Sequence, residues 1–371
     1  MEKDKENKIL NVPALRFPEF TEEWEKVRLG DNCNIQMCKR IMAAQTNTEG
    51  GVPFYKIGTI GSKADAYISK DLFDEYKMKY SFPHKGEVMI TCAGTVGKCI
   101  IYNGEDSYYQ DSNIVWIDNP DKIILNDFLY HLLSRINWSR LNSTTIVRIY
   151  NDDLRNLKLY CPRHDEQKKI TKFLSLIDKR IETQNKIIEK YESLIKGLTI
   201  LLTTQEKSNT TIAQCLECHN STLQESEVSY SGLYKVFGAN GLVGYTDMPQ
   251  MNGDAILIIK DGSGVGATSY AQGKFSVIGT LNYLIPKENY DLRYLYFVLS
   301  VFNFQPYKTG MAIPHIYFKD YGNAKIYCPS LAEQKRIANI LGKLENKLIV
   351  EQDILALFSL QKQYLLGQMF I

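Results

Sequence analysis

One sequence pattern occurs twice in this chain of 371 residues. Tyr160-Cys161-Pro162, followed by Glu166-Gln167-Lys168-Lys169-Ile170, returns 167 positions later as Tyr327-Cys328-Pro329 and Glu333-Gln334-Lys335-Arg336-Ile337. The same offset aligns Ile146-Val147-Arg148-Ile149-Tyr150 with Ile313-Pro314-His315-Ile316-Tyr317 just before each copy. The repeat predicts two diverged copies of one folding unit, each ending in a long helix, that serve two different ligands of one kind.

Each copy continues as a long helical pattern with apolar residues at alternating spacings of four and three, which is typical of a coiled-coil seam. The first seam comprises Ile170, Leu174, Ile177, Ile181, Gln184, Ile188, Tyr191, Ile195, Leu198 and Leu202. The second comprises Ile337, Leu341, Leu344, Leu348, Glu351, Leu355, Phe358, Lys362, Leu365 and Met369. We expect an antiparallel coiled coil, because a whole domain separates the helices, with Gln184 and Glu351 as a buried polar pair that fixes the register.

The length of these helices suggests a spacer. From Ile170 to Leu202 a helix is about 50 Å long, comparable to about 14 base pairs of B-DNA. Two DNA contacts held at a fixed distance are one interpretation. A helical hairpin that only joins two domains or makes an oligomer is the other.

Composition bounds the class of protein. The chain is 44% hydrophobic and 23% charged, and it has room for two domains of about 150 residues. The charged run from Met1 to Lys8 has no signal-peptide core and no stretch approaches about 18 apolar residues, so we expect a cytoplasmic protein with free thiols. The net charge of +2 says little about nucleic acid, because Glu in the helices masks any local basic face.

Two mixed segments lie before the two helices, which predicts an α+β fold with an internal pseudo-twofold repeat. In the first segment, strand-like runs cover Val52 to Ile57, Val88 to Thr91 and Ile114 to Ile117, with a helical stretch from Asp127 to Ser139. In the second, they cover Leu233 to Phe237, Ala255 to Ile259 and Leu281 to Ile285, with a helical stretch from Asp291 to Phe302.

The chain opens with Phe17-Pro18-Glu19-Phe20, Trp24 and Leu29-Gly30-Asp31. Together with the paired Cys-Pro and Glu-Gln-Lys helix starts, these residues make essentially the whole chain resemble the specificity subunit of a type I restriction-modification system. The resemblance implies two tandem target-recognition domains, each reading half of a split, asymmetric site in double-stranded DNA, and two conserved helices that set the gap. It also implies two modification subunits, which methylate adenine at N6 with S-adenosylmethionine, and restriction subunits that use ATP and Mg²⁺.

On this basis we predict five regions. They are an amino-terminal lead (1–20), target-recognition domain 1 (21–159), helical spacer 1 (160–205), target-recognition domain 2 (206–326) and helical spacer 2 (327–371).

Sequence readout requires side chains that reach base edges, while other contacts to phosphate fix the position of the protein. The motif before each helix supplies Arg148 and Tyr150 in one half and His315 and Tyr317 in the other. Further candidates are Lys39, Arg40, Lys56, Lys98, Lys235, Asn240, Lys260, Ser263 and Lys274. The alternatives are a strand edge whose Tyr packs in the core and, for the others, an ordinary solvated surface.

Some strings imitate catalytic or cofactor motifs. Gly262-Ser263-Gly264-Val265-Gly266-Ala267 fits a dinucleotide pattern, but strand-like residues follow it, so we predict a hairpin turn; Gly94-Thr95-Val96-Gly97 is a partial counterpart. Cys215-Leu216-Glu217-Cys218-His219 has haem-attachment spacing, yet no second Cys pair completes a zinc site, and we predict the opening helix of the second domain. Neither a Walker A loop nor an Asn-Pro-Pro-aromatic motif occurs, so we expect no catalytic residue, metal or cofactor in this chain.

Three alternatives stay open at this stage. The chain is the recognition subunit of a related type II system whose methylase and nuclease share one partner polypeptide, a self-sufficient enzyme acting on DNA, or a coiled-coil adaptor with no DNA role.

Overall fold

The computed structural model describes residues 11–138, 148–204, 207–310 and 312–371. The chain forms two compact units, unit 1 (Met1–Glu182 with Ala356–Ile371) and unit 2 (Thr183–Leu355). Each contains one mixed domain and one end of each of two long helices, α5 (His164–Thr203) and α9 (Leu331–Gln368). Predictions for Met1 to Lys8, Ser139, Ile146, Val147 and positions 205–206 lie outside the described residues.

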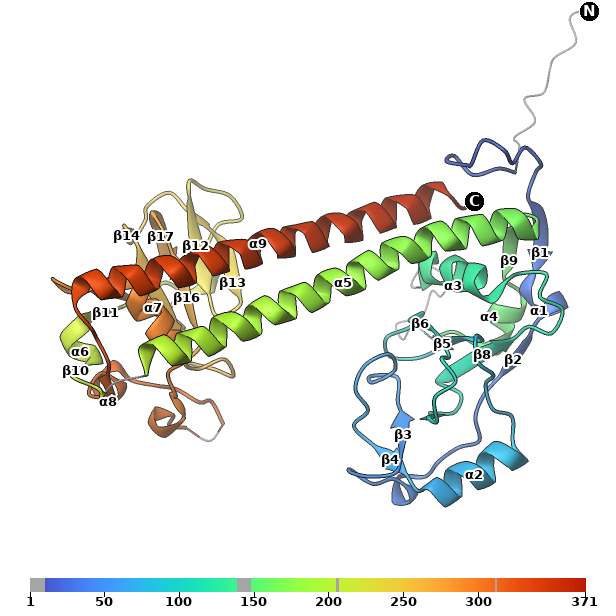
Figure 1. Cartoon of the computed structure of the whole chain (residues 1–371), viewed down its shortest axis with the longest axis horizontal. Helices are drawn as coiled ribbons and strands as arrows, with labels where there is room; N and C mark the ends of the chain where they lie inside the picture. The colour runs from blue at the N-terminus through green and yellow to red at the C-terminus, as the bar shows by residue number, and fades with distance from the viewer. Residues whose placement is uncertain (1–10, 139–147, 205–206, 311) are drawn as a thin grey trace, which may run out of the picture. The chain divides into compact units, whose positions relative to one another are not determined.

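Unit 1 is organised around a four-stranded antiparallel sheet (Figure 1). Its strands lie in the order β2 (Asn34–Gln36), β8 (Ile114–Asp118), β5 (Val88–Thr91) and β6 (Cys99–Ile101). The central β5 is buried at all four positions, as a continuous apolar run predicts for a strand covered on both faces. The other elements are β1 (Glu25–Arg28) paired with β9 (Lys158–Cys161), a sheet of β4 (Tyr67–Ile68), β3 (Val52–Tyr55) and β7 (Tyr108–Tyr109), the helices α1 (Leu29–Asn32), α2 (Lys70–Lys79), α3 (Asn126–Arg135) and α4 (Asn151–Arg155), and a 3-10 turn at Ala43–Gln45.

Unit 2 repeats this plan with different residues. Its antiparallel sheet has the order β11 (Leu216–Asn220), β18 (Leu281–Pro286), β15 (Ala255–Ile259) and β16 (Thr268–Ala271). The other elements are β10 (Thr210–Thr211) paired with β19 (Lys325–Ile326), a sheet of β13 (Gly241–Thr246), β12 (Tyr234–Gly238), β17 (Lys274–Val277) and β14 (Met251–Asn252), the helices α6 (Ile212–Cys215), α7 (Leu292–Ser300) and α8 (Phe318–Tyr321), and 3-10 turns at Glu225–Glu227 and Gln305–Tyr307. The shared strand order confirms the predicted α+β fold with an internal repeat.

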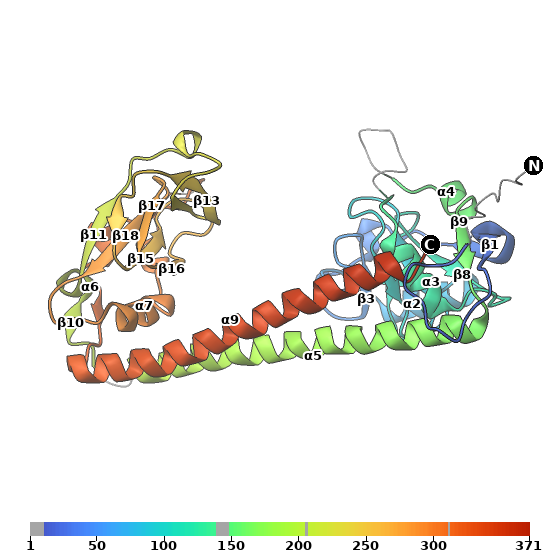
Figure 2. The same cartoon turned by 90° about the horizontal axis from the view of Figure 1, so that it is seen from above.

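The two long helices pack together within each unit (Figure 2). In unit 1, Leu365 near the end of α9 shares a buried core with Leu174 near the start of α5. In unit 2, Leu341 near the start of α9 belongs to the same core as Leu198 near the end of α5. The helices therefore run antiparallel, as predicted, and each mixed domain packs its main core against both of them.

All residues of the two expected seams are buried or half-buried. The polar step lies in unit 2, where Gln184 Nε2 donates hydrogen bonds to Glu351 Oε2 over 2.5 Å and to the Glu351 carbonyl oxygen over 2.9 Å. In unit 1 the second polar position of the α9 seam is paired too, since Lys362 Nζ lies 2.5 Å from Asp178 Oδ1. Polar seam residues are thus satisfied across the helix pair; that Gln184 and Glu351 fix the register stays a prediction.

One local prediction is wrong, and one predicted helix is shorter than expected. The string from Cys215 to His219 is not a helix: only Cys215 belongs to α6, and the rest forms β11, which pairs with β18. Leu216 is buried and Cys218 half-buried at alternate positions, which is strand periodicity that the short string concealed. The helix expected from Asp127 to Ser139 ends at Arg135, because Ile136 adopts an extended conformation.

Candidate nucleic-acid interface

In unit 1 the motif that precedes α5 (Arg148 to Tyr150) lies against the turn between β5 and β6. We call this turn, which contains Gly94 and Gly97, the glycine turn of unit 1. The backbone N–H of Ile149 donates to the carbonyl of Cys92 over 2.9 Å, so Arg148 and Tyr150 lie beside this turn. Burial raises the pKa of the Cys92 thiol to about 12, and the nearby positive charge of Arg148 opposes that rise. Tyr150 is 61% exposed, with the Arg148 guanidinium 5.8 Å from its ring centroid. The alternative in which this Tyr packs in the core is therefore wrong.

In unit 2 the corresponding motif (His315 to Tyr317) lies against the turn between β15 and β16. This turn contains Gly262, Gly264 and Gly266 and is the glycine turn of unit 2. The N–H of Ile316 donates to the carbonyl of Lys260 over 3.0 Å. The half-buried His315 ring lies 5.1 Å from the ring of Tyr317, which is 48% exposed. Lys319, which was not among the predicted residues, lies with its Nζ 5.3 Å from the Tyr317 ring centroid. Its place two positions after the motif was the only available signal.

The structure gathers only part of the candidate set at these turns. Lys98 follows the unit 1 turn and its Nζ donates to the Ile60 carbonyl over 2.5 Å, while Ser263 is exposed at the tip of the unit 2 turn. Lys56 forms an ion pair with Asp65 at 2.9 Å. The other candidates lie on other elements: Lys39 and Arg40 after β2, Lys235 on β12, Asn240 before β13 and Lys274 on β17. Arg40 also pairs with Asp111 at 2.7 Å.

A buried aromatic residue that was not predicted from the sequence supports each glycine turn. Gly97 has φ +84°, and a Cβ there would overlap the Trp138 ring; Gly266 has φ +90°, and a Cβ there would lie 2.9 Å from Phe304 Cβ. Only glycine fits such positions. Trp138 and Phe304 are 166 positions apart, one short of the repeat, so an alignment of the two halves carries the signal.

The repeated Gln of each helix start has a structural role. Gln167 Oε1 accepts the N–H of Leu125 over 2.7 Å, and Nε2 donates to the carbonyl of the preceding proline over 2.9 Å. Gln334 makes the same pair of bonds, with the N–H of Asp291 over 2.9 Å and the preceding proline carbonyl over 2.8 Å. Each Gln thus ties its long helix to the beginning of the short helix of its own domain, α3 or α7.

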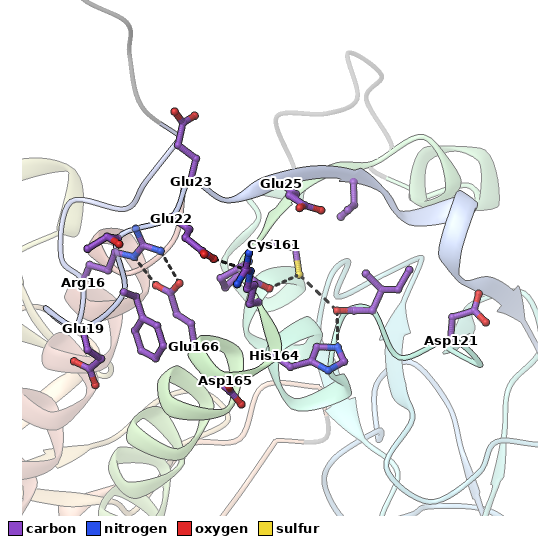
Figure 3. A pocket seen from close by; sticks show the side chains of 16 residues that line it. Arg16, Glu19, Glu22, Glu23, Glu25, Asp121, Cys161, His164, Asp165 and Glu166 are labelled. Atoms are coloured by element: carbon purple, nitrogen blue, oxygen red, sulfur yellow. Dashed lines mark hydrogen bonds and ion pairs between the residues drawn. The ribbon is translucent and has the colours of Figure 1, made fainter.

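A hollow of about 750 Å³ lies at the start of α5 in unit 1 (Figure 3). Acidic side chains dominate its lining: Glu19, Glu22, Glu23, Glu25, Asp121 and Asp165. Arg16 closes one side through two contacts of 2.7 Å with the buried Glu166. Because carboxylates repel phosphate, this hollow is a poor surface for DNA.

In the ranges that the structure describes, no group of three or more His, Cys, Asp or Glu side chains is placed to hold a metal ion. No helix in those ranges combines the length and the apolar character needed to cross a membrane. Cys215 instead lies with its Sγ 3.7 Å from Cys328 Sγ in the core of unit 2.

Comparison with known proteins identifies the family. The family described as "Type I restriction modification DNA specificity domain" matches residues 21–193 and again residues 205–357. Each match covers one mixed domain and more than half of the seam that follows it. The chain belongs to this family.

Relatives and solved structures agree with that assignment. A Haemophilus influenzae protein named "Putative type I restriction enzyme specificity subunit" is 48% identical over 182 residues, which are 49% of this chain and 44% of that protein. The chain thus spans about half the length of the curated relatives it matches. The crystal structure of a type I restriction-modification S subunit from M. genitalium is 18% identical with a TM-score of 0.64, covering 97% of this chain and 99% of that one. A chain from a structural study of type I system assembly is 16% identical with a TM-score of 0.54, covering 94% and 97%. These two likenesses establish the fold.

Proposed function

We propose that this chain is the DNA-specificity subunit of a type I restriction-modification complex and reads a bipartite, asymmetric site in double-stranded DNA. The observation that carries the proposal is the double family match, with one mixed domain in each matched segment. Two copies of one scaffold with different exposed side chains suit two half-sites of different sequence. The five predicted regions, 1–20, 21–159, 160–205, 206–326 and 327–371, divide the chain accordingly.

The two clusters at the glycine turns are the proposed points of base reading. Arg148 offers the bidentate donors that suit guanine O6 and N7, and exposed Tyr150 adds an aromatic edge with a hydroxyl. In the second domain, His315, Tyr317 and Ser263 offer hydrogen bonds of a different pattern. We assign the remaining candidates, Lys39, Arg40, Lys56, Lys98, Lys235, Asn240, Lys260 and Lys274, to contacts that position the protein on the DNA backbone.

The helix pair is proposed to hold the two readers apart and to dock two modification subunits. Large apolar side chains are exposed on the helices of both units: Leu176, Leu357, Leu360 and Tyr364 in unit 1, and Leu194, Leu201, Ile349 and Val350 in unit 2. Leu357 and Tyr364 are one heptad apart and are 64% and 63% exposed. Contiguous apolar side chains on a helix surface are typical of protein interfaces.

In this proposal the chain itself catalyses nothing. The modification subunits bind S-adenosylmethionine, turn the target adenine out of the duplex at a cost of a few kcal/mol, and methylate N6. Restriction subunits use ATP and Mg²⁺. The complex is proposed to be cytoplasmic and to act on DNA there.

A map of N6-methyladenine across the genome, with and without this gene, tests the proposal. We expect methylation to disappear at one split, asymmetric motif when the gene is deleted. An unchanged map in cells that express the protein and both partners would contradict the function.

A further inference from the structure

The tips of the two glycine turns expose backbone N–H groups without acceptors. In unit 1, the N–H groups of Gly94 and Thr95 form no hydrogen bond within the described ranges, although their neighbours Val96, Gly97 and Lys98 all do. Both residues are exposed. Two successive donors therefore face solvent at the end of an otherwise satisfied turn.

The turn of unit 2 has the same feature. The N–H groups of Ser263 and Gly264 have no acceptor among the described residues, while the N–H of Gly262 donates to the Pro314 carbonyl over 2.9 Å and that of Val265 to the Gly262 carbonyl over 3.2 Å. Ser263 and Gly264 are exposed. The feature thus occurs in both copies although the residues differ.

The backbone conformation at both tips suits an anion. Gly94 has φ +66° and Gly262 has φ +100°, so each tip carries a left-handed glycine at or beside the unpaired amides. Successive N–H groups around a left-handed residue form a concave nest that binds anionic oxygen. Trp138 packs against Gly97 and Phe304 packs against Gly266, so each turn lies on a buried ring. A turn that is fixed by packing has less order to gain when it binds a ligand.

The nearby charges favour a phosphate. In unit 1 the turn lies beside Arg148 and is followed by Lys98. In unit 2 it follows Lys260, although the half-buried Asp261 opposes that charge. A dinucleotide is a poor occupant, because strand β16 rather than a helix follows the glycines.

We propose that each glycine turn holds one phosphate of the DNA backbone on its unpaired amides, Gly94 and Thr95 in unit 1 and Ser263 and Gly264 in unit 2. This inference rests on the proposed DNA-reading function. The bound phosphate fixes the position of each domain on its half-site, so that Arg148 or His315 meets the correct base pair.

Matched substitutions separate the amide from the side chain. Thr95→Pro removes the N–H, whereas Thr95→Ala keeps it. Gly264→Pro and Gly264→Ala form the same pair in unit 2 and leave the hydroxyl of Ser263 in place for base reading. Neither Thr95 nor Gly264 has a positive φ, so proline is not excluded by the sign of φ. The probe is a DNA duplex that carries the site found by the methylation map. Single phosphates in it are replaced by neutral methylphosphonates. The protein is the full chain with its modification subunits.

We expect each proline variant to bind about tenfold more weakly and each alanine variant to stay within about twofold of the native chain. One methylphosphonate in the matching half-site should weaken the native complex by a similar factor and the proline variant no further. Because an amide is neutral, the salt dependence of binding should not change, whereas Lys98→Ala, at a residue assigned to the DNA backbone, should lower its log–log slope by about 0.9.

Two results would overturn the nest while leaving DNA reading intact. One is an equal loss of DNA affinity in the proline and alanine variants. The other is a methylphosphonate effect that persists in full in the proline variants. If a proline variant fails to fold, amide exchange in the native complex decides. Protection at Gly94 and Thr95 that requires the charged phosphate supports the nest, and unchanged exchange refutes it. The absence of any mapped site overturns the proposed function and this inference with it.

Discussion

Replacing Gln184 by Leu should destabilise unit 2, because it leaves the Glu351 carboxylate in the helix seam without its donor. Gln184 is 6% exposed, and its Nε2 donates to both the carboxylate and the carbonyl of Glu351. Losing a hydrogen bond to a charged acceptor costs about 2 kcal/mol, and the new apolar contact of Leu offsets about half of that. The net loss of about 1 kcal/mol lowers the melting temperature of a unit of this size by about 2–4 °C.

The double variant Gln184→Leu with Glu351→Leu should behave differently. No polar group is then left unpaired, so stability should return to the native value or exceed it. The helices should also lose their unique alignment, because a purely apolar seam tolerates a shift. Gln352→Leu, at an exposed position of α9, is the control and should stay within about 0.5 kcal/mol of the native chain.

Calorimetric melting gives the stabilities, and the distance distribution between one spin label on each helix reports the alignment. A single narrow distance in the native chain should broaden in the double variant. If the double variant kept both its stability and its narrow distance unchanged, the polar pair would have no role in register.

Further predictions concern other residues. Burial lowers the pKa of His131 to about 4, while Asp178 raises it and Lys362 lowers it, so the folded state disfavours protonation. Stability should therefore be fully present above about pH 6.5 and fall by about 3 kcal/mol as the pH drops to 4, and urea titrations of His131→Leu should lack this fall. Gln167→Ala and Gln334→Ala should each lower the free energy of unfolding, measured by chemical denaturation, by about 2–4 kcal/mol, because each leaves one backbone N–H and one backbone carbonyl without a partner. The control Lys168→Ala, at an exposed position, should lower it by less than about 0.5 kcal/mol. Arg148→Ala should weaken binding to the first half-site and leave the second unchanged in DNA titrations; equal weakening at both would contradict its assignment.

Periodic features were predictable from the sequence. The seams follow a 3.5-residue repeat over their whole length, and β5 and β15 lie at the predicted Val88 to Thr91 and Ala255 to Ile259 because buried strands read as apolar runs. The string after Cys215 was mistaken because five residues cannot separate one helical turn from an edge strand. Its pairing partner β18 lies far along the chain.

Which residues come together at each candidate site was harder to predict from the sequence. The tie between Ile149 and Cys92, and that between Ile316 and Lys260, are backbone hydrogen bonds, which side-chain identity does not encode. These two hydrogen bonds bring Arg148 and Lys260 to the glycine turns, whereas Lys39 and Lys235 lie on other elements. Unpaired amides at a turn tip likewise leave no mark in the sequence except the glycines beside them.

We propose that the helix pair acts as a ruler between the two DNA-reading domains. This role is tested most directly by removing one matched heptad from both α5 and α9 and mapping the methylated motif that results. Seven residues of helix are about 10 Å, so both half-sites should keep their sequences while the unread gap shortens by about three base pairs. An active complex that methylates the original motif with its gap unchanged would contradict the account.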